Sequence, residues 1–109
     1  MAKPKYPNTV IKYEMLDGEV EMTLQMFALY QVRAKSKAVW EKYNKITTGK
    51  GEDGELDIAF VLYVAYMCRC VNAGIDDRYG SFENFLMNLP PDDDAMEAAY
   101  IAMRHPKKA

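Results

Sequence analysis

Two cysteines, Cys68 and Cys70, are the first residues in this 109-residue chain whose type could do chemistry. On a helix, side chains two residues apart point about 200° away from each other. A disulfide or a two-point metal grip at this pair would therefore require an unwound helix. The single histidine, His105, stands near the end of the sequence, and no cysteine or serine is placed to act with it. The sequence predicts two buried thiols and no pairing of a nucleophile with a base.

A second candidate is Gly49-Lys50-Gly51, which lies in an expected loop from Thr47 to Gly54 and suggests phosphate binding. The Walker pattern requires a glycine five residues before the Gly-Lys pair and a serine or threonine after it. This chain has Asn44 and Gly51 at those positions. The loop also joins two expected helices instead of following a strand, so we do not predict a phosphate site.

Three consecutive carboxylates, Asp92, Asp93 and Asp94, are the third candidate. Consecutive helical positions spread over about 200°, and no fourth ligand is near in the sequence, so capping of a helix N-terminus is favoured over a metal site. The other carboxylates fall in loops or caps, where water keeps their acidity ordinary. We expect no enzyme, no metal and no cofactor, and a hydrolase built on carboxylates alone is the one enzymatic alternative.

The composition predicts one ordered domain over residues 1–109, with frayed ends at 1–7 and 105–109. Half of the residues are hydrophobic, which allows a modest core. The chain starts without a secretory signal pattern, and its longest apolar run, Ile58 to Cys68, is short for a membrane span. We expect a cytoplasmic protein that binds no membrane.

The charge is unevenly spread along the chain. Residues 1–50 hold nine Lys or Arg and five Asp or Glu, whereas residues 51–109 hold five and eleven. A net charge of −2 argues against nucleic-acid binding. Two solvated faces explain the asymmetry, and the alternative is that the halves of different copies attract each other in an oligomer.

The first expected element is a β-hairpin with Asp17-Gly18 at the centre of a type I′ turn. Its predicted cross-strand pairs are apolar and share one face: Met15 with Val20, Tyr13 with Met22, and Ile11 with Leu24. The opposite face holds Lys12, Glu14, Glu21 and Thr23. A lone hairpin is marginally stable, so its apolar face must pack on helices.

Helical patterns fill the rest of the chain. Residues 24–46 predict one amphipathic helix or a pair that breaks at Ser36, with a buried stripe of Val32, Ser36, Val39, Tyr43 and Ile46 that Phe27, Tyr30 and Trp40 widen. Further helices are expected at 55–71, at 82–89 after a Ser81 cap, and at 92–104. The predicted fold is mainly α (α+β), a hairpin packed on about four helices. The expected helix at 55–71 is apolar on every side in its middle part. Either the other elements surround it, or another protein covers one of its faces.

A partner-binding surface is predicted on the expected helix at 82–89 and on exposed parts of the apolar helix at 55–71. Eight methionines and eight tyrosines suit adaptable protein surfaces, although most are expected in the core. Apolar anchors beside a double proline would make a rigid ledge, and the candidate residues are Phe82, Phe85, Leu86, Leu89, Pro90, Pro91, Tyr63, Tyr66 and Met67. The alternative is that Phe82 and Phe85 seal the core.

Two stretches resemble the small tail assembly chaperones of long-tailed, siphovirus-type bacteriophages. They are Phe27-Ala-Leu-Tyr-Gln-Val-Arg-Ala-Lys with Tyr43-Asn-Lys, and Ser81-Phe-Glu-Asn-Phe-Leu-Met-Asn-Leu-Pro-Pro-Asp92 after the apolar helix. The resemblance covers most of residues 10–105 and implies a helical protein of the host bacterial cytoplasm. Such a protein coats the apolar tape measure protein until the tail tube forms around it, and it is absent from the finished particle.

The resemblance also implies a possible longer product of the gene. Such proteins are often made in a second form by ribosomal slippage, and Lys107-Lys108 stands where a run of A could lie. The long form would carry a module that recruits the tail tube protein. Two other functions stay open: a small regulatory adaptor that caps one host or phage protein, and a structural tail or head-completion protein.

Overall fold

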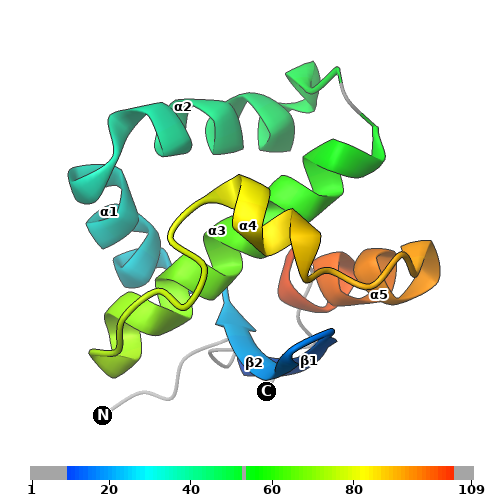
Figure 1. Ribbon diagram of the computed structural model, residues 1–109. Coiled ribbons are helices and arrows are strands. Elements are labelled where there is room, and N and C mark those ends of the chain that lie inside the picture. The colour runs from blue at the N-terminus through cyan, green and yellow to red at the C-terminus, as the bar shows by residue number, and fades with distance from the viewer. Residues whose placement is uncertain (1–9, 53, 105–109) are drawn as a thin grey trace, which may run out of the picture.

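The mainly helical fold with an N-terminal hairpin is confirmed by the computed structural model, which describes residues 10–52 and 54–104 (Figure 1). The elements are β1 (Val10–Met15), β2 (Gly18–Thr23), α1 (Met26–Lys35), α2 (Lys37–Lys45), the π-helical turn η1 (Ile46–Lys50), α3 (Glu55–Ala73), α4 (Phe82–Met87) and α5 (Asp93–Arg104). The predicted fraying at 1–7 and 105–109, and with it His105, lies outside the described residues.

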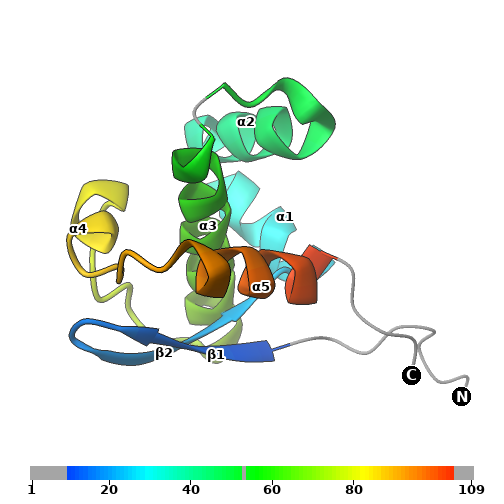
Figure 2. The ribbon, with the colours of Figure 1, turned by 90° about the vertical axis from the view of Figure 1, so that its right-hand side faces the viewer.

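Helix α3 lies at the centre of the fold, as Figures 1 and 2 show from two directions. β2 and the helices α1, α2, α4 and α5 all pack against it. It contributes ten residues to the core: Ala59, Phe60, Val61, Leu62, Tyr63, Val64, Ala65, Tyr66, Cys68 and Cys70. A helix that other elements surround has no side facing solvent, and so it needs no polar side. The central position of α3 therefore explains why its middle part is apolar all round.

The ends of α3 differ in part from the prediction. Glu55 and Asp57 lie in the first turn, at the positive end of the helix dipole. The helix continues two residues past Val71, to Ala73, and stops at Gly74, whose φ of 68° is left-handed. Arg69 therefore lies inside the helix, where it makes an ion pair of 3.0 Å with Glu21 of β2.

By length and composition α3 could cross a membrane, since it has 19 residues and a mean hydropathy of 1.4. In the folded chain 61% of this stretch is buried by the other elements. The core helix of a soluble protein meets the same criterion of length and composition. The expectation that the chain binds no membrane stays a prediction.

The register of the hairpin differs from the predicted one by two residues. Met15 pairs with Gly18, Tyr13 with Val20, and Ile11 with Met22. The turn is Leu16-Asp17, and Gly18 alone in this segment has a positive φ, 128°, so the type I′ turn centred on Asp17-Gly18 is wrong. Because side chains alternate with a period of two, a shift of two residues keeps each side chain on its predicted face.

One face of the hairpin is buried and the other is largely exposed, as predicted, except at Thr23, the last residue of β2. Tyr13, Met15, Val20 and Met22 are each at most 7% exposed. Thr23, which was placed on the solvent face, is 1% exposed and buried. It is the last residue of β2, where the chain leaves the ribbon for α1, and so it does not share the environment of the outer face.

Helices α1 and α2 are the predicted pair, and Ser36 separates them. Ser36 has extended backbone angles, and its hydroxyl accepts a hydrogen bond from the Val39 N–H at 3.3 Å. This cap starts α2 in a new direction. The expected loop after α2 begins instead with the π-helical turn η1, in which the Thr47 and Thr48 hydroxyls donate to backbone carbonyls of α2.

The predicted caps of α4 and α5 are present. The Ser81 hydroxyl accepts a hydrogen bond from the Asn84 N–H at 3.2 Å. Asp92 accepts one from the Ala95 N–H at 3.0 Å, and Asp93 and Asp94 occupy the first turn of α5. The carboxylates therefore serve the positive end of the helix dipole.

A polar cluster attaches the tip of the hairpin to the segment between α3 and α4. The Tyr79 hydroxyl donates a hydrogen bond of 2.8 Å to Asp17, and the Arg78 guanidinium lies 3.5 Å from the same carboxylate. The Arg78 backbone N–H donates to the Tyr66 hydroxyl. The Tyr79 hydrogen bond, with a smaller contribution from Arg78, lowers the pKa of Asp17 below its ordinary value of 3.8.

Asp17→Ala is expected to lower the Tm at pH 7 by a few degrees and to lose this effect in acid. Because folding lowers the pKa of Asp17, its contribution is present above pH 3.8 and disappears as the pH falls through the native pKa. Thermal melts from pH 7 to about pH 2 measure it. Asp76→Ala, at an exposed carboxylate of the same segment, is the control. A difference in Tm between Asp17→Ala and the native chain that stays constant over this range would contradict the assignment.

Candidate protein-binding surface

The predicted ledge is divided between core and rim. Phe85 is 0% exposed, and Tyr63 and Tyr66 are 5% and 4% exposed. The ring of Phe85 lies against those of Tyr63, Tyr66 and Tyr79 at centroid distances of 5.3–6.0 Å. These three residues, which were predicted to bind a partner, are therefore part of the core in the folded chain and not on its surface.

The remaining residues of the ledge lie at its edge. Pro91 is exposed, whereas the half-buried members pack against the core: Met67, Phe82, Leu86 and Leu89. Phe82 meets Phe60 edge-on, with ring centroids 5.0 Å apart, and the Lys42 ammonium lies over both rings. This arrangement closes the core, which is the alternative given for Phe82. Pro90 is half-buried beside the start of α5.

The largest exposed apolar side chains that are close to one another lie on α1. Met26, Phe27 and Tyr30 are 77%, 61% and 64% exposed. Their spacing of three and four residues places them on one side of the helix, and the Phe27 and Tyr30 rings are 6.4 Å apart. The opposite side of α1 carries the buried residues Ala28, Leu29 and Val32.

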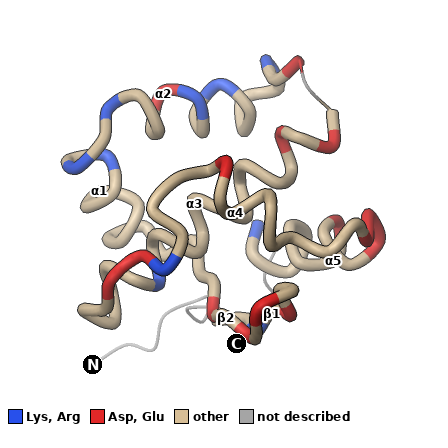
Figure 3. The backbone as a smooth tube through the Cα atoms, in the orientation of Figure 1, with Lys and Arg blue, Asp and Glu red and all other residues tan. Residues whose placement is uncertain are grey.

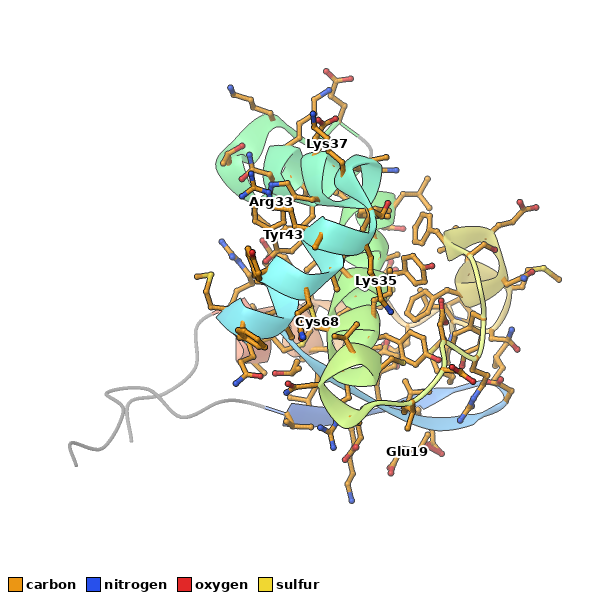
Figure 4. The ribbon with its side chains drawn as sticks, turned by 90° about the vertical axis from the view of Figure 1, so that its left-hand side faces the viewer. Glu19, Arg33, Lys35, Lys37, Tyr43 and Cys68 are labelled. Atoms are coloured by element: carbon orange, nitrogen blue, oxygen red, sulfur yellow. The ribbon has the colours of Figure 1, made fainter. Side chains whose placement is uncertain are left out.

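A basic shelf continues this side of α1 onto α2. Arg33 lies over the Trp40 ring, 5.6 Å from its centroid. A groove of about 550 Å³ passes between Tyr30, Arg33, Lys37 and Trp40. Figure 4 shows Arg33 and Lys35 on opposite sides of α1. Of these two residues, Arg33 borders the groove and Lys35 does not. We call these residues the α1–α2 surface: Met26, Phe27, Tyr30, Arg33, Lys37 and Trp40.

The α1–α2 surface has a net positive charge. Of the five Lys or Arg in residues 26–45, Arg33 and Lys37 border the groove, and so does Glu41, which lies 3.8 Å from Lys37. Figure 3 shows this positive charge along α1 and α2, and the acidic start of α5 on another part of the molecule. An apolar patch beside a positive shelf fits a partner helix with an apolar stripe and acidic neighbours.

Phe27 and Tyr30 were predicted to widen the buried stripe, but both rings are exposed. Helix α1 carries apolar residues around most of its circumference, so periodicity alone does not select the buried side. The available signal was size: the side that packs on α3 carries Ala28, Leu29 and Val32, and the bulky rings lie opposite.

The two thiols are unsuited to nucleophilic chemistry. Cys68 and Cys70 are free and buried, as predicted. Burial raises the pKa of Cys68 to about 12 and also raises the pKa of Cys70, so both stay protonated near neutral pH. Within residues 10–52 and 54–104, no three side chains among His, Cys, Asp and Glu are grouped as metal ligands would be.

The segment Gly49-Lys50-Gly51 lies at the end of η1 between two helices, which is the setting expected for it. Lys50 borders a pocket that is also lined by two lysines and three carboxylates: Lys42, Lys45, Glu41, Glu52 and Asp57. Three carboxylates balance the three lysines, so the pocket has no excess positive charge that would favour a phosphate.

Comparison of the chain with protein-family models, with curated proteins and with solved structures found no match.

Proposed function

We propose that this chain is a phage tail assembly chaperone, which binds apolar helical segments of the tape measure protein before the tail tube forms. The observation that carries the proposal is the exposure of Met26, Phe27 and Tyr30 on one side of α1. Two of these residues lie in the stretch Phe27 to Lys35 that resembles the family. The resemblance suggests that the client is the tape measure protein, and the exposed side chains on α1 support the proposal that a client helix binds there.

A client helix would lie along α1 with its apolar stripe on the two aromatic rings. Aromatic anchors contribute most of the energy of protein interfaces, and a patch of this kind is costly to leave in water. Acidic residues beside the client's stripe would meet Arg33 at the rim and would compete with Glu41 for Lys37. These charges would increase the rate of association more than the affinity.

The double variant Phe27→Asp/Tyr30→Asp is expected to abolish client binding while the chain stays folded. Loss of an anchor costs about 2 kcal/mol or more, which is a decrease in affinity of at least about 30-fold. Both side chains are more than 60% exposed, so the free energy of unfolding should change by about 0.5 kcal/mol per site or less. The measurement is the soluble fraction of the tape measure protein when it is co-expressed with each variant.

Ile101→Asp is the matched control, because Ile101 is an exposed apolar residue of α5 that does not line the groove between α1 and α2. It should maintain the solubility of the client as the native chain does. A tape measure protein that is equally insoluble with and without the native chain would contradict the proposal and favour an adaptor of another partner. Presence of this chain in purified particles would favour a structural tail or head-completion protein.

A further inference from the structure

A groove of about 760 Å³ separates β1 from α5 on the side of the hairpin away from β2. One wall consists of residues 11–15 of β1 and Leu16 of the turn, and the other includes Ala95, Ala98, Ala99 and Ala102 of α5. Figure 2 shows α5 running above β1. The methyl side chains leave room next to the strand that larger residues would fill.

Within residues 10–52 and 54–104, backbone groups of β1 that face this groove have no strand partner. Only two residues separate Met15 from its partner Gly18, so this must be a pair that exchanges backbone hydrogen bonds. By alternation, the N–H and C=O of Tyr13 also point to β2, whereas those of Lys12 and Glu14 point to the groove. The Leu16 N–H agrees with this direction, because it donates at 2.8 Å to the Asn88 carbonyl outside the hairpin.

Tyr13, whose side chain lines the groove, carries a buried hydroxyl that has no hydrogen-bond partner among the described residues. Tyr13 is 7% exposed, and its hydroxyl is the buried side-chain atom that stays unsatisfied. Burial and the nearby Asp92 carboxylate raise the pKa of Tyr13, so the hydroxyl keeps its proton. An unpaired buried donor is costly in a folded protein, which makes it a marker for a missing partner.

The charges on the outer face of β1 define what could lie beside it. Glu14 stands directly opposite Glu19 across the hairpin, an unfavourable pair of like charges, while Lys12 stands opposite Glu21. An added strand with Lys or Arg beside Glu14 would relieve this repulsion. An acidic residue beside Lys12 would add a second favourable pair.

We propose that the groove binds an extended peptide segment of a partner protein, which adds to the free edge of β1 as a third strand. The segment has small apolar side chains facing α5, an acceptor for the Tyr13 hydroxyl, and a basic residue beside Glu14. The backbone of Lys12 and Glu14 supplies the strand hydrogen bonds, and the side chains select the sequence. This site is separate from the α1–α2 surface and does not depend on the proposed chaperone function.

A single strand fits this site better than a second copy of the chain does. Figure 1 shows α5 extending beyond β1 on the side away from β2. Pairing β1 with β1 of another copy would place a two-fold axis next to the strand. The two α5 helices would then compete for the same space above that axis.

The test is a selection with a displayed library of random peptides about 12 residues long, twice the length of β1. Selections run in parallel on the native chain, on Ala102→Trp, which fills the groove, and on Ile101→Trp, which adds the same ring outside it. Peptides with alternating small apolar residues and a Lys or Arg are expected to be enriched about tenfold or more on the native and Ile101→Trp proteins only. Enrichment of the same peptides on all three proteins, or of none on any, would overturn the proposal.

Two further variants examine the strand edge and the hydroxyl with a selected peptide. Glu14→Pro removes an N–H that points to the groove, which edge strands tolerate, and should weaken binding about tenfold or more. Tyr13→Phe should weaken binding about tenfold while thermal melts show an intact fold. Unchanged affinity in both would refute strand addition, and a dimer in light scattering that Ala102→Trp dissociates would assign the groove to a second copy.

Discussion

Phe85→Ala is expected to lower the free energy of unfolding by about 3–5 kcal/mol, the range for loss of a buried phenylalanine. The side chain is 0% exposed and fills the space between Tyr63, Tyr66 and Tyr79. These rings are attached to α3 and to the segment that follows it, so they cannot easily close the cavity. A domain of this size is stable by about 5–15 kcal/mol, and the variant would therefore lose a large share of its stability.

Urea denaturation followed by circular dichroism measures this effect. Met87→Ala is the matched control on the same helix, because Met87 is 71% exposed and should change the free energy of unfolding by about 0.5 kcal/mol or less. Equal midpoints for the two variants would mean that α4 does not pack on α3 as described. A folded Phe85→Ala protein with native stability would restore this residue as a candidate surface anchor.

Met22→Asp is expected to destabilise the chain by about 3–5 kcal/mol, because it places an unpaired carboxylate in the core. Met22 is 0% exposed, and β2 is the strand that packs on α3. Thr23→Asp should be comparably harmful, since Thr23 is 1% exposed. The sequence alone predicts a mild effect at Thr23, so this variant separates the observed environment from the predicted one.

Lys12→Asp provides the control on the outer face of the hairpin. Lys12 is exposed and stands opposite Glu21, so the substitution adds only a solvated repulsion, about 1 kcal/mol or less. Thermal melts of the three variants should rank Lys12→Asp as the most stable by a wide margin. Similar melts for all three would be incompatible with a buried inner face.

The hairpin shows which features of a ribbon the sequence determines. The alternation of apolar and polar residues specifies the two faces, and any register that shifts by two residues satisfies it equally well. The choice between these registers depended on the turn, where Leu16-Asp17 was observed and Asp17-Gly18 was expected. Burial of Thr23 was not predictable from alternation, because it depends on where the chain turns into α1.

The helices were predictable where a local signal marks their ends. Ser81, which caps α4, was predicted as a cap, whereas Ser36, which caps α2, was predicted only as a break between two helices. The burial of a particular ring was harder to predict, since Phe27 and Phe85 both occur in apolar helical patterns and only one is in the core. Packing against α3 decides between them, and that is a property of the tertiary structure.

The candidate surfaces follow the same division. The residues of the α1–α2 surface come from two helices and lie side by side only because the chain changes direction at Ser36. The groove lies between β1 and α5, which are about 80 residues apart in sequence. Neither arrangement has a local signature. The unpartnered hydroxyl of Tyr13 likewise becomes visible only when every neighbour is in place.

The central position of α3 determines when a newly synthesised chain can fold. The hairpin and α1 reach the ribosome exit before α3, yet β2 and α1 both bury their apolar sides on α3. At about 5–20 residues per second, translation from the end of β2 to the end of α3 takes roughly 3–10 seconds. During this interval the first half of the nascent chain has no surface to pack against, so Met22, Leu29 and Val32 remain exposed to the factors that bind emerging chains.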